Sequence, residues 1–239
     1  MVITLIGTGN LGTNLHAALT KAGHTVKQLH GRTFSLSDIV GDIVIISIKD
    51  DAVPAVTERL AGCPQLVVHT AGSLSINTIP TARRGVFYPM QTFSKERLVD
   101  FAEIPIFVES GTEEDTLLLE ELAHSISKVA FRLDSESRKY LHLAAVFACN
   151  FTNHCYKIAE DILREHDIPF SIMLPLIDET AQKVHRLTPQ EAQTGPAIRY
   201  DRSVIGKQEM MLTGYKKEIY QIMSKSIHHH GIEHKDKII

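Results

Sequence analysis

Three glycines near the start of the chain have the spacing of a phosphate-binding turn. The pattern G-x-G-x-x-G is formed by Gly7, Thr8, Gly9, Asn10, Leu11 and Gly12. The first glycine permits a tight turn, the second lets the backbone approach a pyrophosphate, and the third allows close packing of helix on strand. The helix that follows would offer free N–H groups to phosphates. Because the apolar run VITLI precedes the pattern and an amphipathic stretch follows it, we predict a dinucleotide-binding turn rather than a glycine turn without a ligand.

The loop after the second expected strand bears on which dinucleotide binds. The strand TVKQL is followed by His30, Gly31, Arg32 and Thr33, with no carboxylate among them. NAD sites usually place an acidic residue here, because it accepts hydrogen bonds from the ribose hydroxyls. A guanidinium can instead pair with a 2′-phosphate, and Thr33 and Ser35 can add hydroxyl donors. We therefore predict NADP, bound at Gly31, Arg32 and Thr33; the alternative is that Arg32 is a solvated loop residue.

Polar residues also follow the third, fourth and fifth expected strands. Ligands of open α/β sheets bind outside the carboxyl ends of the strands. The further predicted cofactor contacts are therefore Ser47, Ile48, Lys49, His69, Thr70 and Ala71. The predicted substrate contacts of this region are Ser73, Tyr88 and Gln91. Asp50 or Asp51 can also simply cap the helix that begins near Ala52, and Ser73 can be a turn or cap residue.

Short β-branched runs alternate with amphipathic segments up to residue 133. The expected strands are 2–6, 25–29, 43–47, 65–69, 85–88, 105–109 and 129–132, and the expected helices are 11–22, 52–61 and 113–127. The first four strands are mostly continuous apolar runs, as in parallel strands that are covered on both faces. This alternation predicts an α/β fold with a doubly wound, mostly parallel Rossmann sheet. The segment between the second and third strands has room for only about two helical turns.

The pattern becomes helical after Asp134. A first helix is expected over 135–153 and continues to His166, and Pro169 then marks a break. Further helices are expected at about 170–187, 189–193, 201–208 and 209–230. We predict a dinucleotide-binding domain at 1–133 and an all-helical substrate and dimerisation domain at 134–239.

Composition excludes several classes of function. The 239 residues are 44% hydrophobic and 22% charged, with a formal net charge of −3, whereas a nucleic-acid binder would carry a basic excess. No apolar run approaches the roughly 20 residues that span a bilayer, and the first residues lack the basic region of a signal peptide. The three cysteines lack Cys-x-x-Cys spacing, so we predict neither a disulfide framework nor a metal site. We expect a cytoplasmic protein with a small-molecule substrate and neither a nucleic-acid nor a membrane partner.

Several longer strings resemble known families. GTGNLGTNL, HGRT and ISIKDD resemble the nucleotide domain of pyrroline-5-carboxylate reductases and deazaflavin-dependent NADP reductases. HTAGS, YPMQTFS, LHLAAVFACNFTNH and TGPAIRYD resemble a less characterised group of oxidoreductases, which have a Rossmann-like domain and a C-terminal helical domain of unknown function. The resemblance covers essentially the whole chain. It implies NADP, a helical domain like that of 6-phosphogluconate dehydrogenase, a homodimer built through that domain, and an active site where the domains meet. Tyr88 and Tyr200 stand where this group usually has histidine and glycine.

Candidates for acid–base chemistry lie on the first long helix of the second domain. Lys139, His142 and Asn150 occupy the region where related hydroxyacid dehydrogenases carry a lysine and an asparagine, although that pair is not reproduced here. The spacing places all three on roughly one helical face. A histidine suits proton transfer at neutral pH, and Asn150 could bond a carbonyl or the nicotinamide amide. Alternatively, His142 is a hydrogen-bonded core residue and Asn150 makes a contact between helices.

The string TGPAIRYD supplies the remaining candidates. Arg199 is predicted to bind a substrate carboxylate or phosphate, and Asp201 to orient Arg199 or to cap the next helix. The alternative is a structural turn that contains a salt bridge.

Together these features predict an oxidoreductase that transfers a hydride between NADP(H) and a small carbonyl, imine or hydroxy substrate. Two alternatives stay open. The first is a non-catalytic NADP(H)-binding sensor or regulatory protein, because no unambiguous acid–base pair is evident. The second is an enzyme that uses a deazaflavin as the hydride partner.

Overall fold

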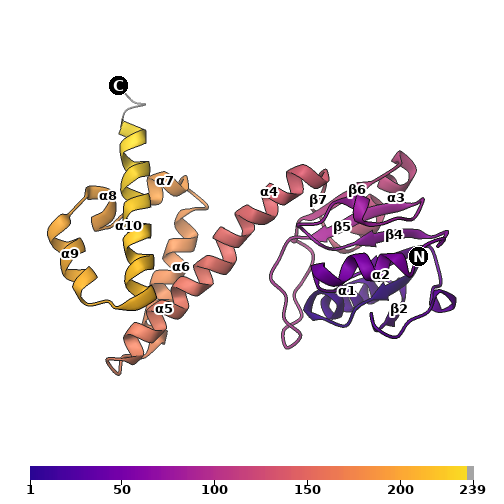
Figure 1. Ribbon diagram of the computed structural model, residues 1–239, viewed down its shortest axis with the longest axis horizontal. Coiled ribbons are helices and arrows are strands. Elements are labelled where there is room, and N and C mark those ends of the chain that lie inside the picture. Colours follow the sequence, from indigo (N-terminus) through magenta and orange to yellow (C-terminus); the bar gives the residue numbers. More distant parts are fainter. Residues whose placement is uncertain (236–239) are drawn as a thin grey trace. The chain divides into compact units, whose positions relative to one another are not determined.

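The first part of the chain builds a seven-stranded sheet (Figure 1). The computed structural model describes the backbone of residues 1–235 and the side chains of residues 1–231. The strands are β1 (Val2–Ile6), β2 (Thr25–Leu29), β3 (Ile43–Ile46), β4 (Leu66–His69), β5 (Arg84–Pro89), β6 (Ile106–Ser110) and β7 (Ala130–Arg132). Their order is β2-β1-β3-β4-β5-β6-β7; β1 to β5 are parallel to one another, and β6 is antiparallel to β5. The predicted, mostly parallel Rossmann-type sheet is confirmed.

Helices cover both faces of this sheet. The helices of this unit are α1 (Asn10–Lys21), α2 (Val53–Glu58), α3 (Glu113–Ile126) and α4 (Ser135–Ala145), with 3-10 turns at Leu36–Asp38, Asp50–Ala52 and Ile76–Thr78. Leu15 of α1 and Leu119 of α3 pack with Ile45 of β3 in one buried cluster. Val53 of α2 packs in a second buried cluster with Val44, the residue that precedes Ile45 in β3. Because consecutive strand residues point to opposite faces and both faces are covered, β3 is buried throughout, which explains its continuous apolar sequence.

A continuous run of helical residues follows the last strand of the sheet. Helix α4 is capped by the Asp134 side chain, which accepts a hydrogen bond from Ser137 N. The run continues through a π-helical segment, Val146–Phe151, into α5 (Thr152–Arg164), as the sequence predicted for 135–166. The later elements are a 3-10 turn at Phe170–Met173, α6 (Leu174–Lys183), α7 (Pro189–Ala192), α8 (Pro196–Arg199), α9 (Arg202–Met210) and α10 (Gly214–Lys235).

The chain divides into two compact units, Met1–Phe151 and Thr152–Ile239. We call the first the sheet unit and the second the helical unit. The predicted domain boundary at 133/134 precedes this division. It lies between β7 and α4, where the last strand ends and the helices begin. Helix α4 packs with the sheet unit, so the site described below can be built from residues of that unit alone.

Two local expectations differ from the structure. The connection between β2 and β3 contains a single 3-10 turn, Leu36–Asp38, instead of a two-turn helix; Ser35 and Asp38 close it with a capping box. The last helix begins at Gly214, not at 209, because α9 continues to Met210 and Gly214 has a left-handed backbone (φ +54°). Within the described residues, no helix combines the length and the apolar character needed to cross a membrane.

Candidate functional site

A cavity of about 920 Å³ opens at the carboxyl edge of the parallel strands. It is lined by the glycine turn after β1, the loops after β2, β3 and β4, the end of β5, and residues of α2 and α4. The strand register explains this grouping, because Ile6 pairs with Leu29 and Ile46, and Ile46 pairs with His69. The polar loops that follow these residues therefore meet at one edge, as the sequence predicted.

The glycine turn is shaped so that its first and third positions admit no side chain. Gly7 has a φ of +131°, and a Cβ atom there would lie 1.9 Å from the carbonyl oxygen of Ser47. A Cβ at Gly12 would lie 2.6 Å from the carbonyl oxygen of Gly7. Gly9, by contrast, has open space on its Cβ side and lines the cavity as the N-cap of α1, without a side-chain cap. This geometry leaves the start of α1 accessible to a phosphate.

Two arginines stand at the loop after β2. Arg32 is exposed and lines the cavity. Arg59, just beyond α2, donates hydrogen bonds to the carbonyl oxygens of Gly31 (2.9 Å) and Phe34, and its guanidinium carbon lies 3.9 Å from the centre of the Phe34 ring. Arg59 therefore holds the loop that carries Arg32 and adds a second positive charge beside it. The sequence analysis did not identify Arg59, because its position follows from the packing of α2 and not from a motif.

At the other end of the cavity, Tyr88 and His142 are joined by a hydrogen bond. The Tyr88 hydroxyl lies 3.0 Å from Nδ1 of His142, and the two rings meet edge to face with centroids 6.0 Å apart. Tyr88 stands at the end of β5 and His142 on α4. Burial raises the pKa of Tyr88; the Arg138 charge lowers it and the Asp50 charge raises it further. The phenol is therefore protonated at neutral pH.

A buried ion pair fixes α4 against the sheet. Arg138 is 0% exposed, and its guanidinium donates to Glu109 Oε2 and to the carbonyl oxygen of Leu74, both at 2.5 Å. Ser135 donates to the same Glu109 oxygen at 2.7 Å and accepts from Ile76 N at 2.9 Å. Since Arg138 lies one turn before His142, this network decides where His142 stands.

Asp50 and His69 complete the surroundings of the pair. Asp50 lines the cavity and accepts a 2.5 Å hydrogen bond from the hydroxyl of Ser73. His69 is fully buried beside the site; its Nδ1 accepts from Ala71 N and its Nε2 lies 3.3 Å from the carbonyl oxygen of Ser75. Burial lowers the pKa of His69 to about 4, so this ring is neutral at neutral pH. Its contacts with Ala71 and Ser75 hold the loop after β4.

The structure brings most of the predicted contacts into this cavity. The predicted cofactor residues that line it are Gly7, Thr8, Gly9, Asn10, Leu11, Gly31, Arg32, Ser47, Ile48, Lys49, Thr70 and Ala71. Gly12 packs below the turn, Thr33 is exposed outside the lining, and His69 is buried behind it. Among the predicted substrate contacts, Tyr88 lines the cavity, whereas Ser73 lies outside the lining and donates a hydrogen bond to Asp50, which lines it.

Other predicted residues lie elsewhere. Lys139 pairs with Glu136 at 2.6 Å on the exposed side of α4, and Asn150 is exposed on the π-helical segment. Gln91 is exposed and its side-chain oxygen accepts from Thr92 N. Arg199 and Asp201 belong to the helical unit, where Arg199 is exposed and Asp201 caps α9 through a 3.1 Å bond from Val204 N. The capping alternative for Asp201 is therefore realised.

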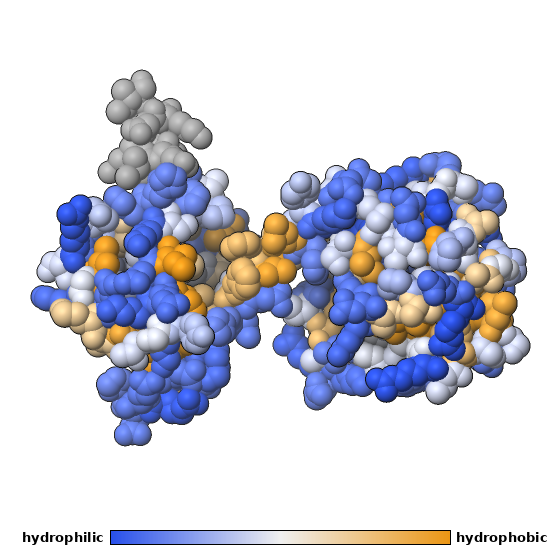
Figure 2. Space-filling view, in the orientation of Figure 1, coloured by the Kyte–Doolittle hydropathy of each residue, from blue (hydrophilic) through white to orange (hydrophobic). Residues whose placement is uncertain are grey.

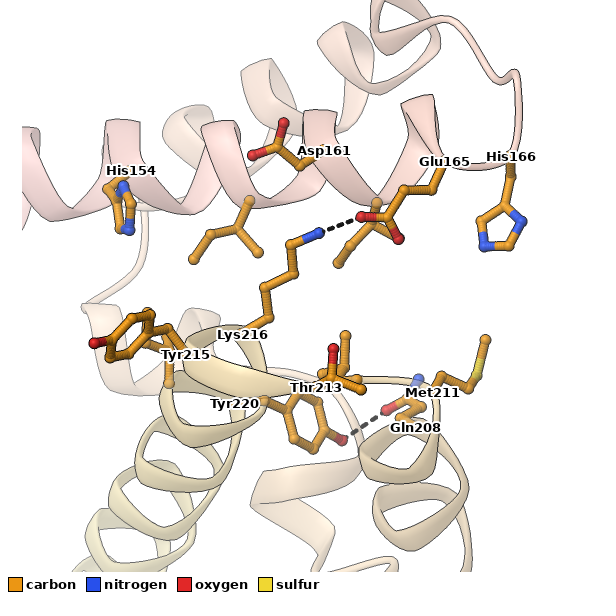
Figure 3. Close-up of a pocket in the computed structure, with 14 residues that line it drawn as sticks. His154, Asp161, Glu165, His166, Gln208, Met211, Thr213, Tyr215, Lys216 and Tyr220 are labelled. Carbon is orange, nitrogen blue, oxygen red and sulfur yellow. Dashed lines mark hydrogen bonds and ion pairs between the residues drawn. The ribbon is translucent and has the colours of Figure 1, made fainter.

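The helical unit has a cavity of its own, of about 660 Å³, lined by α5 on one side and by the end of α9, the segment after it and the start of α10 on the other (Figure 3). Lys216 and Glu165 face each other across it and form a 2.6 Å ion pair, and Tyr220 donates to Gln208. None of the predicted site residues lines it. Its central charges neutralise each other, so the sheet-unit cavity is the stronger candidate for chemistry.

Comparisons with known proteins agree with the fold. The chain matches the family model described as domain of unknown function DUF2520 over residues 104–227. It is similar to a crystal structure named "putative NADP oxidoreductase" from Bacteroides fragilis, with 42% identity over 95% of this chain and 98% of that one and a TM-score of 0.83. No curated protein matches the chain.

More distant structures share the fold. An imine reductase from Myxococcus stipitatus in complex with NADP+ has 16% identity and a TM-score of 0.63, with 99% of this chain and 95% of that one covered. A Plasmodium falciparum pyrroline carboxylate reductase with NADP bound has 13% identity and a TM-score of 0.62, with 95% and 98% covered. At this identity the likeness concerns the Rossmann sheet and the helical C-terminal region. With the family match and the similar Bacteroides structure, the chain belongs to the DUF2520 family.

Proposed function

We propose that the protein is an oxidoreductase that uses NADP(H) at the carboxyl edge of its sheet. The observation that carries this proposal is the geometry of the glycine turn. The carbonyl oxygens of Ser47 and Gly7 occupy the space that side chains at the first and third glycines would need, while Gly9 is open to the cavity. The names of the similar Bacteroides, Myxococcus and Plasmodium structures support the same cofactor.

The lining residues fit the parts of this dinucleotide. The pyrophosphate would lie on the turn at Gly9 and the start of α1, where backbone N–H groups and the helix dipole favour anions. The 2′-phosphate would pair with Arg32, which Arg59 supports. The nicotinamide end would lie towards Thr70, Tyr88 and His142. When bound, the group supplies or accepts a hydride; the chain supplies orientation and proton transfer.

The experiment is a titration of NADPH by fluorescence, followed by a turnover screen. The screen offers aldehydes, ketones, cyclic imines and 2-hydroxy acids and follows nicotinamide absorbance. We expect NADPH to bind more tightly than NADH and at least one class to be turned over. Binding without turnover across all four classes would instead favour a sensor or regulatory protein, and tighter binding of NADH would contradict the assignment of the 2′-phosphate to Arg32.

We also propose that residues 134–239 serve substrate binding and assembly into a homodimer. The support is the exposure of apolar side chains in the helical unit, some of which are visible at its surface in Figure 2. Met210, Met211 and Tyr215 are 77%, 76% and 82% exposed, and among the described residues of this unit Ala197 is the one buried apolar side chain. Exposed apolar surface of this extent is typical of protein interfaces, and a second copy of the chain would cover it. Lys139, Asn150, Arg199 and Asp201 stay candidates for substrate contacts in that assembly.

A further inference from the structure

Three elements of the sheet unit hold the hydrogen-bonded pair of Tyr88 and His142 in place: strand β5, the loop after β4, and helix α4. Tyr88 is 8% exposed and its ring lies beside Phe107, its partner across β5 and β6. His142 lies so close to the loop after β4 that a Cβ atom on Gly72 would stand 2.5 Å from its Nδ1. The Arg138 network holds α4 one turn away. The 3.0 Å contact between the two side chains therefore follows from the packing of three elements.

The pair also stands apart chemically from the other polar groups nearby. Lys139 is neutralised by Glu136 outside the cavity, and the Ser73 hydroxyl is donated to Asp50. The Thr70 hydroxyl donates to the carbonyl oxygen of Ile46 at 3.3 Å. Among the described side chains that line this end of the cavity, Tyr88 and His142 are thus an acid and a base that are joined to each other and reach the cavity.

We propose that Tyr88 is the catalytic proton donor of the reaction at this site and that His142 returns the proton to it. The inference rests on the oxidoreductase function proposed above. In the tautomer that carries its proton on Nδ1, His142 donates to the Tyr88 oxygen and leaves the phenolic hydrogen free to point into the cavity.

The step balances as the reduction of a carbonyl compound by NADPH. The carbonyl carbon takes the hydride, the carbon–oxygen π pair moves to oxygen, and that oxygen takes the phenolic proton of Tyr88. The Tyr88 oxygen regains a proton from Nδ1 of His142 while Nε2 of His142 takes one from the solvent, so the imidazole stays neutral and the net reaction consumes one solvent proton. An iminium substrate would need no such donor, because hydride addition to it gives a neutral amine. The pair therefore favours an aldehyde or ketone, with the corresponding alcohol in the reverse direction.

Three charged or titratable groups act on the Tyr88 phenol. Burial raises its pKa, the Arg138 charge lowers it and the Asp50 charge raises it, and His142 contacts it directly. A cationic nicotinamide ring beside it would favour the phenolate and lower the pKa, whereas the reduced ring is neutral. The two redox forms of the cofactor thus provide a probe that needs no substrate.

The test is a ¹⁹F NMR titration of the full chain labelled with 3-fluorotyrosine. The fluorine reports ionisation and lowers the phenol pKa, which keeps the titration in a range where both cofactor forms survive. The Tyr88 signal is assigned by its loss in Tyr88→Phe. We expect the Tyr88 pKa to be lower by about 1 or more in the complex with NADP+ than in that with NADPH. Tyr140, which is 74% exposed on α4, is the internal control and should titrate alike in both. In His142→Phe, with folding checked by circular dichroism, the Tyr88 pKa should rise because the donor to its oxygen is gone.

Each outcome decides a different point. If neither cofactor form binds, the proposed function fails and this inference falls with it. If both bind but the Tyr88 pKa is the same in the two complexes, the proton-donor role is overturned while the proposed function stands. If the pKa differs between the complexes but His142→Phe leaves it unchanged, Tyr88 is the donor and the role of His142 is overturned.

Discussion

At the scale of single residues, glycines without side chains and positively charged arginines give the sheet-unit cavity its shape and charge. Gly7 and Gly12 are needed because carbonyl oxygens occupy the space of their missing side chains. Gly9 is different, since its Cβ side is open and no packing contact of the fold requires its missing side chain. Arg32 and Arg59 place two cations at the far end of the same cavity.

The first residue-scale prediction concerns Arg32. Arg32→Ala should weaken NADPH binding by about 10- to 100-fold, because a hydrogen bond to a charged phosphate contributes about 1.5–3 kcal/mol. NADH, which lacks the 2′-phosphate, should be affected far less. Fluorescence titration of both nucleotides measures the two effects. Equal losses for NADPH and NADH would show that Arg32 does not contact the 2′-phosphate.

The second concerns Gly9. Gly9→Ala should leave thermal stability nearly unchanged, because no heavy atom beyond the glycine and its two chain neighbours lies within 4 Å of the added methyl. It should weaken NADPH binding by about tenfold or more, because the methyl holds the pyrophosphate away from the backbone. Gly111→Ala is the matched control, since it is equally open and does not line the cavity. NADPH affinity that is unchanged in Gly9→Ala would place the phosphates elsewhere.

At the scale of elements, β4, β5 and α4 bring together residues that are far apart in the chain. Tyr88 and His142 are 54 positions apart in the chain and meet because α4 packs against the sheet, where Arg138 is buried against Glu109. A buried charge that loses its partner is strongly unfavourable, so the pair specifies the docking of α4. The loop after β4 completes this arrangement, with His69 neutral beneath it.

His69 gives the element-scale prediction. Its pKa is about 4 in the folded protein and ordinarily about 6.5, so between these values the unfolded chain binds a proton that the folded protein does not. Its contribution to stability is therefore complete above pH 6.5 and lost as the pH falls towards 4, by about 3 kcal/mol. Urea unfolding at pH 7.5, 6, 5 and 4.5 measures the loss. His69→Gln should flatten this part of the profile, and a variant with the same pH dependence as the unaltered protein would contradict the assignment.

At the scale of the whole molecule, the two units differ in how they are stabilised. The sheet unit has two apolar clusters on opposite faces of the sheet. In the helical unit, helices α5, α6 and α9 contain no buried residue. Helices obtain most of their stability from packing of an apolar face, so we expect the helical unit to pack against a further surface.

The whole-molecule prediction is that the protein is a dimer in solution. Light scattering after size exclusion should give twice the 26.6 kDa mass of one chain, and the melting temperature should rise with protein concentration, because association stabilises the folded state by mass action. The double variant Ile172→Glu/Leu176→Glu, at two side chains that are each 58% exposed, should shift the mass towards the monomer. A monomer with a concentration-independent melting temperature would contradict the proposed assembly.

The sequence by itself determined the sheet, the glycine turn and most of the residues that line the sheet-unit cavity. These depend on local signals, since apolar runs, glycine spacing and residues just after a strand act over a few positions. It also indicated His142 and Tyr88 separately. Only the tertiary structure joined them in a hydrogen bond and revealed Arg59 and Arg138, because these contacts depend on how α2 and α4 return to the sheet. The same spacing that grouped Lys139 with His142 could not show that Glu136 neutralises Lys139 outside the cavity, since a shared helical face does not specify what lies opposite it.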